Sequence, residues 1–438
     1  MGMGRKKDRE KQQDLWVAAS EIVTTPAHAF YERLNTILNA EKFDQRVEAI
    51  CQKYYKSSSG RPSMTPGTYF RMLLLGYFEG IDSERGIAWR AADSFSFRKF
   101  LGFDLSEQTP DHTTVSRTRR LYSIETHGAV MKWVLKILRK HGLADGQSVC
   151  IDATPLQANA SMKSLVRRDT GQTHDDYLRQ LAAAEGVENA SKEQLARFDR
   201  KRKKKASNDD WTNPNDPSAR ITKMKDGRTK LSHKAEHGVD LASGVVLAVT
   251  VQPADRGDTT SYVETLDAAQ REAGKAHPAG IEEVVMDKGY HSGAVLVDLA
   301  EREISSYVPE PERGKRHWSG REQEQRCVCA NRRRVRAQRS KRLQKLRGEL
   351  CERSFAHCYE TGGMRRMYVR GTDDVLKRVL VQAAAFNIGL LLRTLSGWGK
   401  PRQAQGRTIA LTGPLFAVSS VQDAYRALSG RTLSTASA

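Results

Sequence analysis

Two short apolar runs that each end in an aspartate, Ser148-Val-Cys-Ile-Asp152 and Glu283-Val-Val-Met-Asp287, decide the fold predicted for this chain. Such runs are typical of buried strands. Between them, the segments 231–240 and 245–251 flank Ser243-Gly244, which is the pattern of a β-hairpin. Helical patterns are expected at 260–273, 340–359 and 374–395. Strands interspersed with helices predict a mixed α/β domain (α+β) over residues 146–395.

The segment before residue 146 carries helix signals and few strand signals. Thr65-Pro66 places a capping residue before a proline at the first helical position, and Asp111 precedes a second helical run. Apolar residues recur at helical spacing from Ile124 to Lys140. We therefore expect an all-α domain over residues 13–145, preceded by a disordered basic arm at 1–12.

The composition points to a polyanionic partner. The chain has 438 residues, with 72 Lys and Arg against 52 Asp and Glu, so its formal net charge is +20. Nucleic acid is the first candidate, because Lys and Arg gain affinity by releasing phosphate counterions. An anionic membrane surface is less favoured, since the sequence shows no basic amphipathic helix of the lipid-binding kind. The apolar run 379–392 is short and contains Gln382 and Asn387, so no transmembrane helix is expected.

The expected location is the cytoplasm. The charged N-terminus lacks the apolar stretch of a secretory signal. Six cysteines include no C-x-x-C pair, which disfavours a zinc ribbon and favours free thiols.

Positive charge is concentrated in two runs. Seven of the nine residues 197–205 are Lys or Arg, and residues 311–347 hold fourteen Lys and Arg against three Glu. We interpret 160–228 as a polar insertion or long loop with one helix, 311–347 as a basic segment near the active site, and 396–438 as a flexible tail. Candidate DNA-binding residues in these runs and in the N-terminal helices are Arg117, Arg119, Arg120, Lys201, Arg202, Lys203, Trp318, Arg332, Arg333, Arg334 and Arg336. A solvated surface, or for Trp318 a buried anchor, is an alternative interpretation.

The two strand-end aspartates predict a metal site. Asp152 and Asp287 on neighbouring strands would meet closely, and two carboxylates at that distance stay ionised when a cation lies between them. Oxygen ligands of this kind select Mg²⁺ or Mn²⁺. A third acid is expected from the helix at 340–359, where Glu349 and Glu352 are candidates. We favour Glu352, because it lies at the rim of the apolar stripe that contains Phe355.

Several motifs carry a family resemblance. Ile151-Asp152-Ala-Thr154-Pro155-Leu-Gln157-Ala-Asn159, Asp287-Lys-Gly289-Tyr290 and Glu352-Arg353-Ser-Phe355 resemble the DDE transposases of bacterial insertion sequences, as does Pro110-Asp111-His-Thr-Thr-Val-Ser-Arg117 in the helical domain. The resemblance covers roughly residues 30–395. It implies an RNase H-like catalytic core, a catalytic and metal-binding triad of Asp152, Asp287 and Glu352 with two Mg²⁺ or Mn²⁺ ions, and cut-and-paste transposition. The implied partners are double-stranded DNA (terminal inverted repeats and target DNA) and a second copy of the chain, in the bacterial nucleoid.

The sequence departs from this family in one motif. Related transposases often carry Tyr-x2-Arg-x3-Glu-x6-Lys around the last acid, whereas this chain has Gly348 and Tyr359 at the Arg and Lys positions. Candidate substitutes for the missing cations are Arg347, Arg353 and Arg365. Two other functions stay open at this point: a DNA-binding protein without catalysis, and a metal-dependent nuclease of the same fold.

Overall fold

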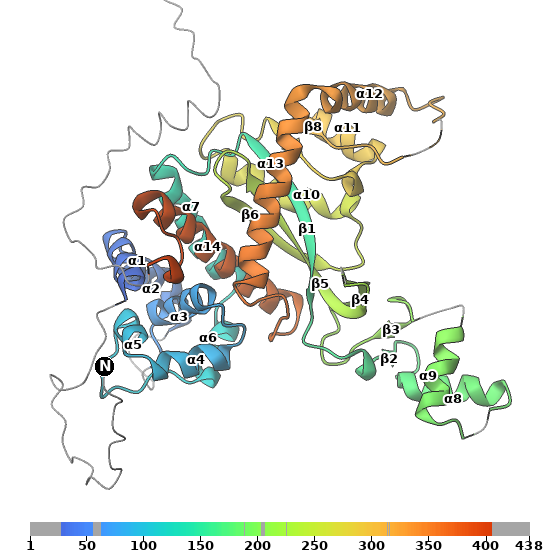
Figure 1. The fold of residues 1–438 in the computed structure, drawn as a ribbon, viewed down its shortest axis with the longest axis horizontal. Coiled ribbons are helices and arrows are strands. Elements are labelled where there is room, and N and C mark those ends of the chain that lie inside the picture. The colour runs from blue at the N-terminus through green and yellow to red at the C-terminus, as the bar shows by residue number, and fades with distance from the viewer. Residues whose placement is uncertain are drawn as a thin grey trace, which may run out of the picture.

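The computed structural model describes residues 28–55, 63–187, 189–202, 206–224, 226–312, 314 and 316–404. Figure 1 shows a group of helices beside a sheet that is covered by further helices. The arm expected at 1–12 and most of the tail expected at 396–438 lie outside the described residues. The first part of that tail is packed: after α14 ends at Ser396, a short turn at Pro401–Ala404 buries both Pro401 and Ala404.

The N-terminal part is helical, as the caps predicted. Its helices are α1 (Ala29–Ala40), α2 (Phe43–Cys51), α3 (Pro66–Glu79), α4 (Glu84–Asp93), α5 (Phe95–Leu101), α6 (His112–Leu121) and α7 (Ile124–Lys140). The Thr65 hydroxyl accepts the Thr68 N–H at the start of α3, and Asp111 accepts the Thr114 N–H at the start of α6. Capping of these donors fixes where each helix begins.

A six-stranded mixed sheet forms the second part and confirms the expected α/β class. Its strands are β1 (Ser148–Gln157), β4 (Arg220–Lys223), β5 (Thr229–Asp240), β6 (Val246–Pro253), β7 (Glu283–Val285) and β8 (Ser305–Tyr307). The order is β4-β5-β1-β7-β8, and β6 also pairs with β5 as the predicted hairpin. β1 runs antiparallel to β5 and parallel to β7, so it lies in the middle of the sheet.

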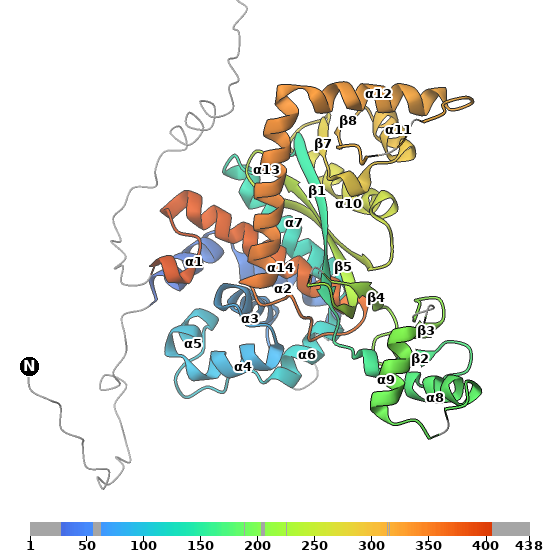
Figure 2. The same cartoon turned by 45° about the vertical axis from the view of Figure 1, so that its right-hand side comes forward.

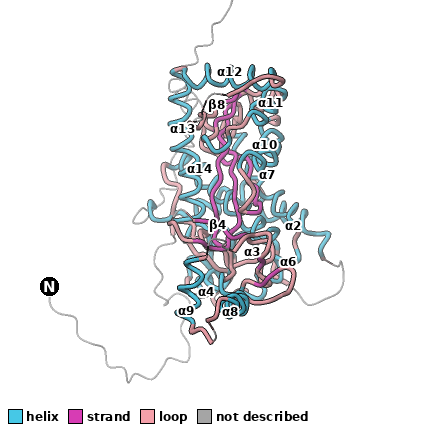
Figure 3. Tube along the Cα trace, turned by 90° about the vertical axis from the view of Figure 1, so that its right-hand side faces the viewer, coloured by secondary structure: helices cyan, strands magenta, loops and turns pink. Residues whose placement is uncertain are grey.

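Helices cover both faces of the sheet. They are α10 (Asp258–Ala273), α11 (Gly293–Glu301), α12 (Glu322–Arg336), α13 (Gln338–Phe355) and α14 (Thr372–Ser396). Figure 3 shows α13 and α10 on opposite sides of the strands. The Cys351 thiol of α13 lies 2.6 Å from that of Cys150 on β1. On the other face, a methyl group at Gly238 of β5 would lie 3.2 Å from Ala269 of α10. Side chains of each strand therefore alternate between the two helices.

The buried helix α14 joins the two parts of the protein. It packs against α7 and α3 on one side and β6 on the other. Among the described residues it is the one helix long and apolar enough to cross a membrane, and 83% of that apolar stretch is buried inside the protein. Burial of this kind is typical of a core helix.

The segment 160–228 is a folded module, which corrects the alternative of a long loop with one helix. It contains β2 (Val166–Arg167), α8 (His174–Ala184), α9 (Lys192–Lys201) and β3 (Trp211–Thr212). The expected helix is present as α8, and a second helix and two short strands accompany it. Leu165 and Trp211 form a small core of their own, and the Arg167 guanidinium lies over the Tyr177 ring. In Figures 1 and 2 the module projects from the end of the sheet near β4. One tryptophan and cation–π contacts supply a core that hydropathy does not reveal.

Two asparagines satisfy edge residues of the sheet, one on β6 and one just after β8. Asn387 of α14 accepts the Val246 N–H at 3.0 Å and donates to the Val246 carbonyl at 2.8 Å. Asn331 of α12 does the same with the N–H and carbonyl of Val308, just after β8. Figure 2 shows α12 lying across this end of the sheet. Each carboxamide supplies the bonds that a neighbouring strand would make, which leaves these edge groups satisfied.

Replacing Asn387 with leucine should lower the free energy of unfolding by at least about 2 kcal/mol, because two buried backbone groups of Val246 lose their partners. Urea unfolding followed by circular dichroism measures the change. The matched control is Thr394→Ala on the exposed face of the same helix, expected within about 0.5 kcal/mol of the parent. Equal stability of the two variants would contradict the role assigned to Asn387.

Candidate active site

Asp152 and Asp287 lie level with each other along two adjacent parallel strands. Asp152 is inside β1, which continues to Gln157, so the expectation that this strand ends at Asp152 is wrong; Asp287 lies two residues after the end of β7. The last paired residues of β1 and β7 are Cys150 and Val285. Asp152 follows Cys150 by two residues, and Asp287 follows Val285 by two. In parallel pairing, equivalent positions point to the same face of the sheet. The register therefore brings the two predicted acids alongside each other, and the Asp152 carboxylate faces α13 through Arg347.

The carboxylate of Asp152 already binds a cation from α13. The Arg347 Nη1 lies 2.8 Å from Asp152 Oδ2, and the two side chains are 19% and 18% exposed. The other oxygen, Oδ1, accepts the N–H of Ala153 at 2.8 Å. Gln344 accepts the Arg347 Nε–H and is itself anchored to the carbonyl of Tyr307. Sequence reasoning proposed Arg347 as a DNA contact and missed this ion pair.

Asp287 begins a tight turn, and a second acid stands beside it. Its Oδ1 accepts the N–H of Gly289 at 2.7 Å. A methyl group at Gly289 would lie 3.0 Å from this oxygen and 3.0 Å from Asp258 Oδ2, so the two carboxylates flank one point where a larger residue would be crowded. Asp258 is bound by Lys234 at 2.7 Å. The glycine of the Asp-Lys-Gly-Tyr motif is therefore explained by close approach.

A buried carboxylate anchors the turn that holds Asp287. Glu236 on β5 accepts hydrogen bonds from the hydroxyls of Ser261, Thr265 and Tyr290 at 3.0, 2.6 and 2.8 Å. Burial raises the pKa of Glu236, although the three hydroxyls act in the opposite direction. Burial, and then the nearby Glu236 carboxylate, also raise the pKa of Tyr290. A charged residue inside an otherwise strand-like run was the sequence signal for this network.

The helix α13 crosses the sheet next to the two aspartates. One face of α13 presents residues at spacings of three and four: Gln344, Arg347, Cys351 and Ser354. Gln344 bonds the Met286 carbonyl just after β7, and Ser354 bonds His237 on β5. Between them, Arg347 and Cys351 contact Asp152 and Cys150 on β1. Glu352 follows Cys351, and its exposed carboxylate makes no hydrogen bond or ion pair with the described residues. Glu349 lies further round the helix and pairs with Arg353. The arrangement favours Glu352 over Glu349 as the third acid.

His237 links β5 to the end of α13. It is paired across the sheet with Asp152. Its Nδ1 lies 2.9 Å from the Ser354 hydroxyl and its Nε2 lies 2.6 Å from the Tyr359 hydroxyl. Burial lowers the pKa of His237 to about 3, so the ring is neutral. Tyr359, which stands where related transposases carry Lys, is thus a buried structural residue.

Carboxylates suited to a divalent cation are present, although they are not assembled into a closed cage. Among the described residues, no group of three or more His, Cys, Asp or Glu is close enough to hold a metal ion. The second oxygen of Asp287 and the carboxylate of Glu352 have no partner there, and Asp152 already attracts a guanidinium. Hard oxygen donors of this kind fit Mg²⁺ or Mn²⁺, and Arg347 occupies one of them in this structure.

Several predicted DNA contacts are engaged within the chain. Arg119 is buried between Glu84 and Asp374, so it joins the helical part to α14 and is a correction to the expected DNA contact. The other intrachain pairs are Arg332 with Glu310, Arg334 with the Ser306 carbonyl, Arg202 with Asp199, Arg353 with Glu349, and Arg365 with Glu360 and Thr154. Trp318 is half-buried, packs against the core and stacks with Arg316.

The remaining candidates are exposed on the described surface. They are Arg117, Arg120, Lys201, Arg333 and Arg336, whereas Lys203 lies outside the described residues. On α12, the exposed Arg326 extends the row formed by Arg333 and Arg336. These three side chains make no ion pair with described residues, so they keep their charge available to a partner.

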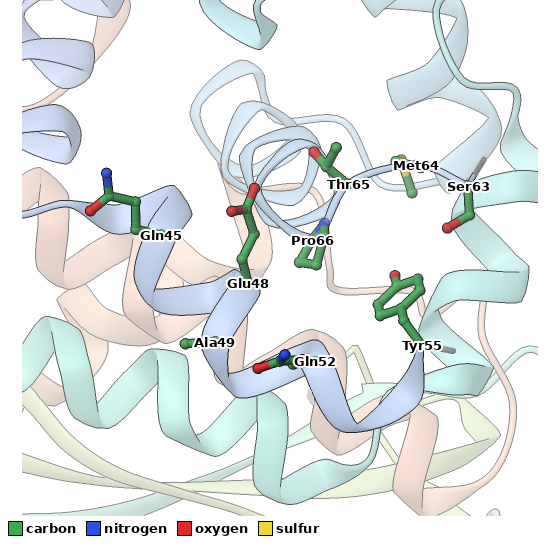
Figure 4. Close-up of a pocket in the computed structure, with 9 residues that line it drawn as sticks. All are labelled: Gln45, Glu48, Ala49, Gln52, Tyr55, Ser63, Met64, Thr65 and Pro66. Carbon is green, nitrogen blue, oxygen red and sulfur yellow. The ribbon is translucent and has the colours of Figure 1, made fainter. Parts of the chain in front are cut away.

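Two open hollows lie away from the acids. One, of about 550 Å³, is formed between α2 and the start of α3, where Figure 4 shows Glu48 and Gln52 on one wall and Thr65 and Pro66 on the other. The other, of about 690 Å³, lies between α11 and α12 and is lined in part by Arg326 and Arg333. Neither is lined by Asp152, Asp287 or Glu352.

The neutral state of His237 predicts a pH dependence of stability. An unfolded histidine titrates near 6.5. Between about pH 6.5 and 3 the unfolded chain therefore binds a proton that the folded chain does not. The contribution of His237 to the free energy of unfolding is complete above pH 6.5 and falls by up to about 1.4 kcal/mol per pH unit below it.

The variant His237→Gln should be less stable than the parent at pH 8 but lose stability less steeply between pH 6.5 and 4, as measured by urea unfolding. His317→Gln, at an exposed site, is the control, and an unchanged slope in His237→Gln would contradict the assignment.

Comparison with known families agrees with the geometry. A family model described as Transposase DDE domain matches residues 144–388, which include Asp152, Asp287 and α13. A second, described as a transposase domain of the DUF772 type, matches residues 19–121 in the helical part. No curated protein and no solved structure matches the chain. The first match spans more than half of the chain, and together with the mixed sheet and the helical N-terminal part it establishes that this protein belongs to the DDE transposases of insertion sequences.

Proposed function

We propose that the chain excises and integrates an insertion sequence by Mg²⁺-dependent hydrolysis of phosphodiesters, followed by attack of the freed 3′-hydroxyl on target DNA. The observation that carries this proposal is the level position of Asp152 on β1 and of Asp287 just after β7, beside the helix α13 that carries Glu352. Membership of the DDE transposases supports the same chemistry.

In this proposal Asp152, Asp287 and Glu352 hold two Mg²⁺ or Mn²⁺ ions. Bound ions of this type activate a water or a 3′-hydroxyl and stabilise the leaving oxygen. The protein contributes the orientation of the carboxylates. The Glu236–Tyr290 bond holds the turn after Asp287, and the Cys351 contact holds α13 against β1 next to Glu352.

The proposed partner is double-stranded DNA, as terminal inverted repeats and as target. The net charge of +20 and the exposed arginines of α12 support it. Bringing two element ends together requires at least two copies of the chain, so we propose a homodimer in the active complex. Its place of action would be the bacterial nucleoid.

Neutral substitutions of the acids test the catalytic assignment. Asp152→Asn, Asp287→Asn and Glu352→Gln should each reduce strand cleavage by about a hundredfold or more, because removal of a metal ligand takes away several kcal/mol of transition-state stabilisation. Binding of a terminal duplex should stay nearly unchanged. The assay incubates purified protein, labelled DNA and Mg²⁺, and scores nicked and joined products separately.

Glu349→Gln is the matched control on α13 and should cleave normally. Loss of activity in this variant but not in Glu352→Gln would reverse the choice of the third acid. Nicks without joined products from the parent protein would favour the metal-dependent nuclease, and normal cleavage by all three variants would refute the mechanism.

The exposed face of α12 predicts the salt dependence of DNA binding. Replacing Arg326, Arg333 and Arg336 with glutamine should flatten the plot of log affinity against log salt by about 0.9 for each phosphate that the protein no longer neutralises. Terminal and random duplexes should be affected alike, because phosphate contacts carry no sequence information. Fluorescence titrations at several ionic strengths measure the slope.

The control for net charge is the triple variant of Lys132, Lys136 and Lys140 to glutamine. These residues lie on α7, which contacts α10 through the Arg139–Glu272 pair, on the side of the sheet away from α13. A slope that is unchanged in the α12 variant, or changed equally in both, would show that α12 is a solvated surface.

A further inference from the structure

We propose that Arg347 is an internal cation that occupies Asp152 when no DNA is bound, and that a DNA phosphate draws it away and thereby opens the carboxylate to a metal ion. This inference rests on the proposed function, since it assumes that Asp152 is a metal ligand. It adds that binding of metal and binding of DNA are coupled through one side chain.

The ion pair engages the oxygen that a metal would need. Arg347 Nη1 donates to Asp152 Oδ2 at 2.8 Å, while Oδ1 is bonded to the Ala153 N–H at 2.8 Å. Both side chains are less than one-fifth exposed, so solvent screens this pair weakly. A divalent cation at Oδ2 would lie next to the guanidinium, and the two positive charges would repel each other. Arg347 and the metal therefore compete for Asp152.

The surroundings hold Arg347 at Asp152 and offer it an exit. Gln344 accepts the Arg347 Nε–H and is fixed by the Tyr307 carbonyl, so the side chain is oriented toward the acid. Beside it on α13, Gly348 leaves open space, since a methyl group there would meet nothing within 4 Å. The exposed Lys341 and Lys345 on the preceding turns attract a phosphate backbone to the same helix.

A DNA phosphate is the anion that can take Arg347 from Asp152. The planar guanidinium binds phosphate through two parallel N–H bonds, and a phosphodiester that enters the site brings such an acceptor. Linkage then requires reciprocity: if DNA strengthens metal binding by removing Arg347, metal must strengthen DNA binding by the same factor.

The first experiment measures Mn²⁺ affinity of the full chain without DNA, by calorimetry. Arg347→Gln should bind Mn²⁺ at least about fivefold more tightly than the parent, which is the lower end of typical coupling between sites. Arg347→Lys, which keeps a cation at this position, should stay closer to the parent. The matched control is Arg90→Gln, which removes a surface pair with Asp93 and causes the same change in net charge. Thermal unfolding by circular dichroism verifies that each variant is folded.

The second experiment measures the affinity of a labelled duplex by fluorescence anisotropy, with Ca²⁺ in place of Mn²⁺ to prevent cleavage and with EDTA as reference. Added Ca²⁺ should strengthen DNA binding by the parent and have a clearly smaller effect on Arg347→Gln. Equal or weaker Mn²⁺ binding by Arg347→Gln, or an undiminished Ca²⁺ effect, would overturn the inference.

The two levels of proposal fail separately. If Asp152→Asn and Asp287→Asn bind Mn²⁺ as the parent does, the metal site itself is wrong. If both lose Mn²⁺ binding while Arg347→Gln matches the parent, the metal site stands and only the role of Arg347 is refuted.

Discussion

The parallel pairing of β1 with β7 is the constraint on which the rest of the structure depends. Pairing of Cys150 with Val285 places Asp152 and Asp287 level with each other, and a slip by one residue would turn one acid to the opposite face. That face must then be covered, because β1 is central and apolar around Cys150 and Ile151. The helix α13 supplies the cover and brings Glu352 along it. Register, burial and chemistry therefore have one origin.

The mixed sheet also needs its edges closed. α14 and α12 each place an asparagine carboxamide against an edge residue, Val246 and Val308 respectively. The edge of β8 receives additional bonds from Arg334 to Ser306. In α14, Asn387 is a polar residue within the mainly apolar run 379–392, and its carboxamide allows α14 to pack as a core helix against a strand. Unpaired strand edges promote pairing with other chains, so these helices also protect the sheet from aggregation.

Local signals in the sequence predicted much of the fold. Thr65-Pro66, Asp111 and the hairpin at Ser243-Gly244 are recognised because caps and tight turns depend on adjacent residues. The module at 160–228 was missed because its core depends on Trp211 meeting residues distant in sequence, within a polar composition. The same limit applies to the site. Strand-like runs pointed to Asp152 and Asp287, but the continuation of β1 beyond Asp152 depends on its pairing with β5. The pairing of Arg347 with Asp152 and of Arg119 with Asp374 likewise joins residues far apart in the chain.

The departure from the usual pattern before the last acid has a structural explanation. Successive residues of a helix are rotated by about 100°, so an arginine at 347 points toward Asp152 whereas one at 348 would point further round the helix. Glycine at 348 costs the helix about 1 kcal/mol relative to alanine. It leaves open space four residues before Glu352, on the same side of the helix. An arginine at 347 and a glycine at 348 therefore place the cation on Asp152 and leave open space on the side of the helix that carries Glu352.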